Sequence, residues 1–186
     1  MSEFDPARAK ARLLELVRTR AYEDGLDVVL ASGKRSTFYI KGKKITLHPE
    51  GLWLVARLML RELESLPAVT AVGGLTLGAD PIAAAVAALS HETGQNLGAF
   101  LVRKEAKGHG VGGRIEGDLA PGQKVAIVED TITTGGSAQK AIEAVREAGA
   151  EPVVVLAVAD REDADAFPAE FDVRPLVGLA EIRDGR

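Results

Sequence analysis

The sequence predicts an α/β protein in which a mostly parallel central sheet is flanked by helices. Apolar runs typical of buried strands alternate with segments of helical periodicity between residues 68 and 159. The run at 152–159 is almost continuously apolar, as in parallel strands that are covered on both faces. The chain has 186 residues, of which 46% are hydrophobic and 27% are charged, a composition typical of a globular domain.

The N-terminal part of the chain predicts two helices and a hairpin. Residues 5–20 carry leucine and valine at helical spacing, and residues 48–64 show the same periodicity. Between these helices, β-like runs at 27–31 and 37–41 flank a polar and basic turn at 32–36. Two short strands separated by such a turn are typical of a hairpin.

Strands and helices then alternate along the chain. Strands are expected at residues 68–73, 97–102, 124–128 and 152–159, and helices at residues 79–92 and 137–148. The interval from Lys104 to Gln123 interrupts this order, because it is rich in glycine and has no apolar periodicity. A stretch of that length inside a compact domain is usually a functional loop.

Composition excludes several kinds of chemistry. The chain contains no cysteine, which excludes disulfides, thiolate-bound zinc, iron–sulfur clusters and cysteine nucleophiles. Three histidines are too few for a dense histidine site, so any metal is expected to be a hard cation held by oxygen atoms. The net charge of -4 argues against a nucleic-acid partner. Neither a membrane span nor a signal peptide is recognisable, so a cytoplasmic protein is expected.

The most specific signal lies at residues 125–137. Four apolar residues lead into Glu129 and Asp130, and a loop of hydroxyl-bearing residues and glycines then runs into the predicted helix. Ligands of open α/β sheets bind at the carboxyl ends of the strands, and this is one such end. The loop consists of Thr131, Ile132, Thr133, Thr134, Gly135, Gly136 and Ser137.

Such a loop is suited to a phosphate group. Its backbone N–H groups and the positive end of the following helix attract an anion, and its glycines permit close approach. The two carboxylates suit the hydroxyl groups of a sugar, or a magnesium ion beside them. A phosphate next to vicinal hydroxyls describes a ribose 5-phosphate. The alternative is a structural strand end followed by a helix-capping turn.

The segment 125–137 resembles the phosphoribosyl pyrophosphate (PRPP) signature of the type I phosphoribosyltransferases. The resemblance implies the type I phosphoribosyltransferase fold, with Glu129 and Asp130 on the ribose hydroxyls and residues 131–137 around the 5-phosphate. It implies Mg²⁺ as cofactor, bound mainly through PRPP and water, so that no protein metal ligands are expected. Asp130 is also a candidate catalytic residue for proton transfer on the leaving group or a ribose hydroxyl.

A second charged segment, Arg103 to Gly110, follows the strand at 97–102. Three cations and a histidine lie within seven residues, and glycines make the segment mobile. Mobile cations that close over a departing pyrophosphate would stabilise its charge and exclude water. The alternative is a solvated charged loop. The cations and the histidine are Arg103, Lys104, Lys107 and His109.

This segment resembles the catalytic loop of the orotate phosphoribosyltransferases. Residues 32–39, 46–51 and 159–162 agree with the same family. The resemblance implies that the loop contacts pyrophosphate through Arg103, Lys104, Lys107 and His109, with Lys107 as the catalytic residue closest to the transition state. In that family the loop enters the neighbouring subunit's site, so a homodimer with a shared lid is implied.

The same resemblance assigns Thr133 and Arg161 to orotate, whose carboxylate suits an arginine fork. A surface ion pair is the alternative for Arg161. Two positions depart from the family pattern: Ala31 stands where many members have lysine, and Thr76-Leu77 stands where many have Tyr-Lys. The family's side-chain contacts at these positions are therefore not expected in this chain. Binding of pyrophosphate is expected to depend more on backbone groups and on the lid.

The resemblance implies a single phosphoribosyltransferase domain over residues 1–186. We expect an α/β core at about 49–160, a hood formed by 1–48 and 161–186, and a lid at 103–117. The expected reaction transfers 5-phosphoribosyl from PRPP to orotate, giving orotidine 5′-monophosphate and pyrophosphate in de novo pyrimidine biosynthesis. The alternatives are a phosphoribosyltransferase for another nucleobase and a non-catalytic regulator that senses PRPP.

Overall fold

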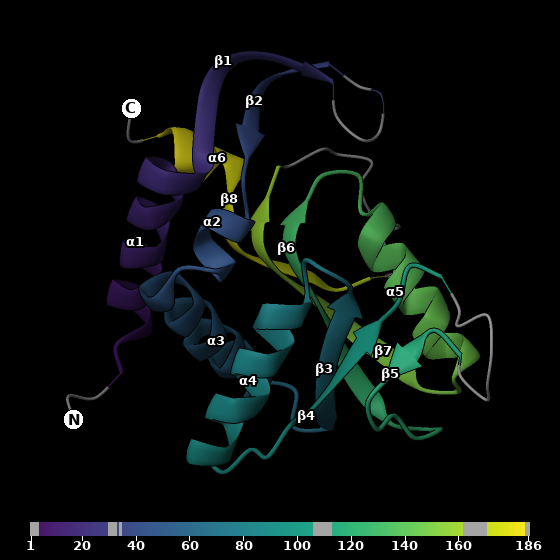
Figure 1. Cartoon of the computed structure of the whole chain (residues 1–186). Coiled ribbons are helices and arrows are strands. Elements are labelled where there is room, and N and C mark those ends of the chain that lie inside the picture. The colour runs from purple at the N-terminus through teal and green to yellow at the C-terminus, as the bar shows by residue number, and fades with distance from the viewer. Residues whose placement is uncertain (1–3, 30–32, 34, 106–112, 162–170, 185–186) are drawn as a thin grey trace.

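A parallel sheet forms the centre of the molecule (Figure 1). The computed structural model describes residues 4–29, 33, 35–105, 113–161 and 171–184. Within them, a six-stranded sheet has the order β5-β4-β3-β6-β7-β8, and its neighbouring strands are parallel except β4 and β5. The strands are β3 (Val69–Leu75), β4 (Gly98–Val102), β5 (Ile115–Glu116), β6 (Lys124–Ile132), β7 (Glu151–Asp160) and β8 (Val173–Gly178). The predicted fold class is therefore confirmed.

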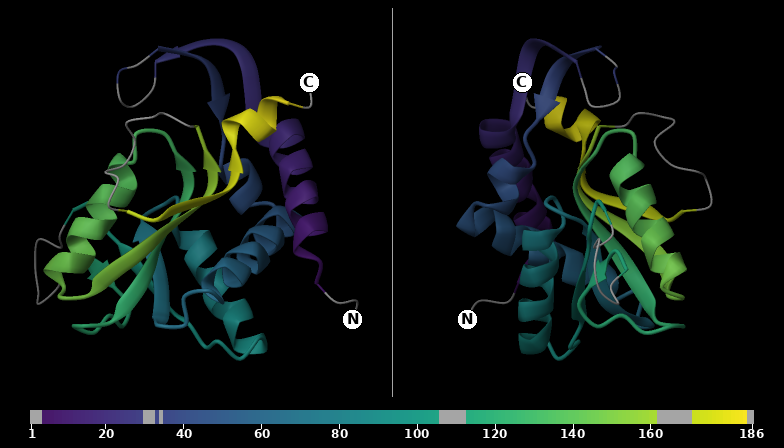
Figure 2. Two further views of the ribbon diagram at one scale, coloured as in Figure 1. Left: turned by 180° about the vertical axis from the view of Figure 1, so that it is seen from behind. Right: turned by 45° about the vertical axis from the view of Figure 1, so that its right-hand side comes forward.

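Helices cover both faces of this sheet. Helices α3 (Pro49–Leu63) and α4 (Asp80–Glu92) lie on one face, and α5 (Gly136–Glu147) lies on the other (Figure 2). Successive β6 side chains therefore enter different cores: Ala126 and Val128 pack on the α3 and α4 side, whereas Val125 and Ile127 pack on the α5 side. Burial on both faces explains why this strand reads as a continuous apolar run.

The N-terminal elements and the last helix lie together at one end of the sheet (Figure 1). Asp5 caps the first helix by accepting bonds from the Ala7 and Arg8 amides at 3.0 and 3.2 Å. The antiparallel hairpin projects over the carboxyl edge of the main sheet. These elements are α1 (Pro6–Leu16), the π-helical turn η1 (Val17–Ala21), β1 (Tyr22–Val29), β2 (Arg35–Ile40), α2 (Lys43–Thr46) and α6 (Leu179–Arg183).

Two expectations need correction. The expected hood includes residues 173–178, but β8 pairs with β7 in parallel and so belongs to the central sheet. The expected lid includes residues 115–116, but they pair with β4 as a short antiparallel edge strand. The α6 helix does reach the N-terminal elements, because Lys10 forms an ion pair with Glu181 at 2.8 Å. Within the described residues, no helix is both long and apolar enough to cross a membrane.

Candidate active site

The acid pair lies at the carboxyl end of β6, which runs two residues beyond it to Ile132. Glu129 is buried, and its Oε1 accepts a hydrogen bond from the Asp130 amide at 3.1 Å. Gly78, in the loop after β3, lies against both carboxyl groups: a Cβ there would be 2.7 Å from Glu129 Oε1. The loop that follows β3 therefore closes one side of the acid pair.

The two carboxyl groups differ in environment. Burial, first, and the nearby charge of Asp130, second, together raise the pKa of Glu129 to about 8, and Lys43 opposes the shift. With this pKa, Glu129 keeps its proton at neutral pH. Glu129 can then donate one hydrogen bond to a hydroxyl group.

Asp130 also contacts the N-terminal segment of the chain. Lys43 Nζ lies 3.3 Å from Asp130 Oδ2. Gly42, the residue before Lys43, must be small. A Cβ there would be 2.6 Å from Thr131 Oγ1 and 3.0 Å from Asp130 Cβ. Glycine thus allows the start of α2 to approach the end of β6 closely enough for this ion pair.

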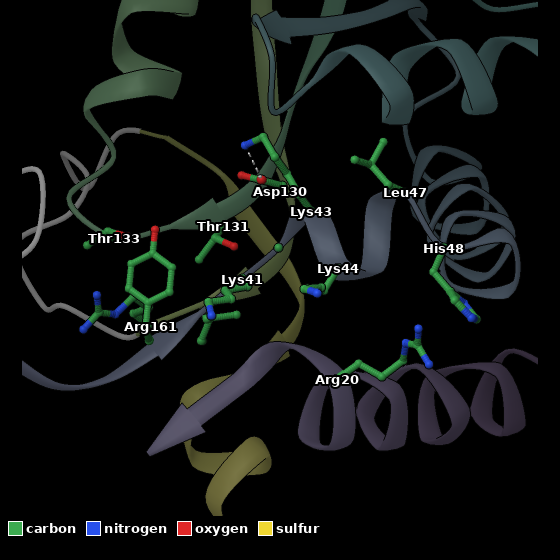
Figure 3. Close-up of a pocket in the computed structure, with 13 residues that line it drawn as sticks. Arg20, Lys41, Lys43, Lys44, Leu47, His48, Asp130, Thr131, Thr133 and Arg161 are labelled. Carbon is green, nitrogen blue, oxygen red and sulfur yellow. Dashed lines mark hydrogen bonds and ion pairs between the residues drawn. The ribbon is translucent and has the colours of Figure 1, made fainter. Parts of the chain in front are cut away.

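A cavity of about 670 Å³ opens beside Asp130 (Figure 3). Thr133 and Arg161 lie on one side of it, Arg20 and His48 on another, and Lys43 and Asp130 between them. Asp130 is the one carboxylate among its described lining residues. The cationic lining residues are Arg20, Lys41, Lys43, Lys44 and Arg161. Such a lining favours an anionic ligand.

A smaller cavity, of about 160 Å³, adjoins the loop that follows β6. It lies at the N-terminus of α5, where Gly135 adopts a left-handed conformation with φ 71°. The structure brings together the whole predicted phosphate loop and Glu129 around this cavity. Its lining residues are Tyr39, Glu129, Thr131, Ile132, Thr133, Thr134, Gly135, Gly136, Ser137 and Ala138.

Arg161 is buried rather than placed at the surface, with 7% of its area exposed. Its Nη2 donates to Ser36 Oγ at 2.8 Å, and its guanidinium lies over the Phe38 ring at 4.3 Å from the ring centroid. Both partners come from β2. The structure therefore brings Arg161 and Thr133 to one cavity, with the hairpin as its cover.

The predicted lid residues are placed only in part. Arg103 forms an ion pair with Glu116 at 2.6 Å, and neither Arg103 nor Lys104 lines the two cavities described above. The structure does not bring these two cations to the acid pair. Lys107 and His109 lie outside the described residues.

Sequence reasoning missed Tyr39, the Lys41–Lys44 segment and Arg20 as cavity residues. The run Lys41-Gly42-Lys43-Lys44 does carry a usable signal, because a glycine between lysines directly after a hairpin permits close approach of several cations. Arg20 offers no such signal, since it lies among helical residues that carry other cations.

A parallel α/β sheet whose carboxyl edge carries an acid pair, a phosphate-type loop and a cationic cavity defines a type I phosphoribosyltransferase. An orotate phosphoribosyltransferase of Rhodopirellula baltica is 46% identical over 99% of this chain and 97% of its own length. One of Corynebacterium glutamicum is 45% identical over 95% of both chains. The chain belongs to the orotate phosphoribosyltransferase family.

Solved structures agree with this assignment. The orotate phosphoribosyltransferase of Mycobacterium tuberculosis, in complex with Fe(III) dicitrate, matches with a TM-score of 0.78 and 44% identity, covering 94% of this chain and 99% of that one. A phosphoribosyltransferase from Corynebacterium diphtheriae matches with a TM-score of 0.78 and 42% identity, covering 94% and 98% of the two chains. No protein-family model matches the chain.

Proposed function

We propose that this chain transfers the 5-phosphoribosyl group of PRPP to orotate, forming orotidine 5′-monophosphate and pyrophosphate in pyrimidine biosynthesis. One observation carries the proposal. Glu129 and Asp130 lie at the end of β6, next to a phosphate-type loop and beside a cationic cavity that is lined by Arg161. The M. tuberculosis relative has been solved in complex with PRPP, and it matches this chain with a TM-score of 0.73 and 41% identity.

In this proposal the sugar and its phosphate occupy the end of β6. Backbone N–H groups of residues 131–137 and the positive end of α5 hold the 5-phosphate. Glu129 and Asp130 hold the ribose hydroxyls. A nitrogen of the base then displaces pyrophosphate at the anomeric carbon, and the protein contributes positioning and charge stabilisation. Asp130 is the proposed acceptor for a ribose hydroxyl proton.

Orotate is assigned to the cavity side that carries Thr133 and Arg161. The base bears a carboxylate, and a buried guanidinium is the side chain best suited to bind it through two parallel hydrogen bonds. The burial of Arg161 supports this assignment over a surface ion pair, because water competes less for a buried cation.

Mg²⁺ is the proposed cofactor. Within the described residues, His, Asp and Glu side chains form no group of three or more that could hold a metal ion. The residues present do fit a magnesium ion carried by its substrate, because Asp130 supplies carboxylate oxygens at the cavity wall. When bound, Mg²⁺ would neutralise charge on the pyrophosphate group.

We also propose that the active form is a cytoplasmic homodimer with a lid shared across subunits. Arg103, Lys104, Lys107 and His109 would then act on pyrophosphate in the partner's site. Arg103 pairs with Glu116 and does not line the large cavity of its own subunit. This supports a role for Arg103 in the site of the other subunit. We propose further that the single domain keeps its hood at residues 1–48.

The test follows orotate absorbance in the presence of PRPP and Mg²⁺, with uracil, adenine and xanthine measured in parallel. Selective consumption of orotate supports the proposal. Turnover of another base instead would identify a phosphoribosyltransferase of different specificity. Binding of PRPP without turnover of any base would identify a non-catalytic regulator, and either result contradicts the proposal.

A further inference from the structure

Cationic and aromatic side chains pack together around Arg161, on the side of the cavity that is assigned to orotate. The guanidinium carbons of Arg161 and Arg183 lie 4.3 and 4.6 Å from the centroid of the Phe38 ring. Both distances fall within the range of cation–π attraction. Arg161 follows β7 and Arg183 lies in α6, so one side chain of the hairpin connects the sheet to the C-terminal helix.

The hydroxyl group of Ser36 fixes the orientation of this contact. It donates to the Phe38 carbonyl at 2.7 Å, and it accepts from the Phe38 amide at 3.3 Å and from Arg161 Nη2 at 2.8 Å. A serine hydroxyl has one donor and two acceptor positions, so these three bonds use all of them. The proton direction is therefore set by the backbone of β2, and a lone pair faces Arg161.

The Phe38 ring is itself held from the opposite strand. Tyr22 of β1 stacks on it with centroids 5.8 Å apart and an interplanar angle of 29°. The Tyr22 hydroxyl accepts a bond from Arg183 Nε at 3.1 Å. Because each member of this layer has a second contact, the ring has little freedom to turn, and Arg161 lies over a defined surface.

We propose that Ser36, Phe38 and Arg183 are positioning residues that hold the Arg161 guanidinium for the carboxylate of the base. They thereby set the preference for a carboxylated pyrimidine over the same ring without a carboxylate. The hydroxyl of Ser36 and the ring face of Phe38 fix where the Arg161 guanidinium lies before the base binds. Fixing the planar fork in advance also removes the entropy loss of ordering it during binding.

The inference rests on the proposed function, so its test begins with two reference proteins. Wild type is assayed for orotate turnover, and Arg161→Ala is compared with it. Failure of the wild type to use orotate would refute the proposed function itself. An active wild type with a defective Arg161→Ala leaves the positioning proposal to be decided by the variants that follow.

The deciding variants are Ser36→Ala, which removes the acceptor, and Phe38→Leu, which removes the ring face but keeps apolar bulk. Each should raise the KM for orotate about five- to twentyfold, the range expected for a weakened charge-assisted contact. The KM for PRPP and the inhibition constant of uracil should change less than about twofold, because neither ligand presents the carboxylate. Ser36→Thr and Phe38→Tyr should restore orotate affinity.

Two further variants separate positioning from general support of the fold. Thr37→Ala, on the exposed side of the same strand, should leave all three constants unchanged. Arg183→Gln keeps the hairpin sequence intact and should raise the KM for orotate alone. The proposal is overturned if Ser36→Ala, Phe38→Leu and Arg183→Gln leave the KM for orotate at its wild-type value. It is equally overturned if they weaken orotate, uracil and PRPP in equal proportion.

Discussion

The ammonium group of Lys43 lies 3.3 Å from Asp130 Oδ2, although 87 positions separate the two residues in the sequence. The side chain of Asp130 is 13% exposed, whereas that of Lys43 is 55% exposed. A pair with one such exposed member contributes little to stability. The contact is therefore better understood as charge balance at the acid pair, where an anionic substrate has to bind.

Lys43→Gln should lower kcat/KM for PRPP about three- to tenfold, as expected for loss of a partly exposed charged contact. The reason is that PRPP would then approach the acid pair without a compensating cation. The effect should shrink as salt is added, because screening weakens exposed charge interactions. Initial rates at low and high ionic strength measure both effects.

The matched control for this change is Lys124→Gln. Lys124 is the first residue of β6, at the end of the strand opposite Asp130, where it forms an exposed ion pair with Glu151 at 3.9 Å. This variant should keep the wild-type kcat/KM. Equal losses in the two variants, or no loss in Lys43→Gln, would show that Lys43 does not act on PRPP binding.

Gly42→Ala tests the close approach of α2 to β6. Gly42 has helical dihedral angles, φ -49° and ψ -37°, so alanine meets no backbone penalty there. Its Cβ would nevertheless collide with Thr131 Oγ1 at 2.6 Å, and one of the two segments must move. We expect turnover to fall at least about tenfold and stability to fall by about 1–3 kcal/mol, as in other overpacked sites.

Thermal unfolding and steady-state kinetics measure these two quantities. Gly98→Ala is the control, because a Cβ there would meet Ala71 Cβ at 3.6 Å, an ordinary contact. It should leave both turnover and stability close to wild type. An active Gly42→Ala enzyme with an unchanged KM for PRPP would mean that the approach of α2 has no role in the reaction.

Glu129→Gln should change how stability depends on pH. The pKa of Glu129 is about 8 in the folded protein, raised from 4.5 by burial and by the charge of Asp130. Below pH 4.5 the group is protonated in both states and contributes nothing. Between pH 4.5 and 8 the unfolded chain loses this proton first, so rising pH favours unfolding by up to about 1.4 kcal/mol per pH unit.

Glutamine removes this ionisation while keeping the shape of the side chain. The variant should therefore gain stability over wild type as pH rises through that window, and the difference should level off above pH 8. Melting temperatures at a series of pH values provide the measurement. A difference that is constant from pH 5 to pH 9 would mean that Glu129 is ionised in the folded protein.

The acid pair and its loop could be predicted because they are contiguous in sequence, and buried strands mark their position. The contacts that complete the site could not, because they join distant segments: Arg161 meets Ser36 across 125 positions. Tertiary packing, rather than an apolar sequence pattern, also determines that residues 173–178 form the strand β8. Arg174 and Pro175 interrupt its apolar pattern, and proline is tolerated there because β8 is an edge strand.

The shared lid can be tested with two variants that disable different parts of one site. Asp130→Asn should reduce turnover severely while leaving the fold intact, because it removes a charge that faces the cavity rather than the core. Lys107→Ala should also lose most turnover, since a cation that meets pyrophosphate only on closure stabilises the transition state more than the ground state. Each homodimer alone should therefore be nearly inactive.

Mixing these two variants and allowing subunits to exchange then distinguishes the two possible arrangements. If the lid acts across the dimer, each mixed dimer has one site with both defects and one intact site. Half of the dimers in a randomised mixture are mixed, so activity should return to about a quarter of wild type, by the independence of separate sites. Mass spectrometry verifies the exchange. If exchange is complete and activity does not return, each lid serves its own subunit, and the proposed sharing is wrong.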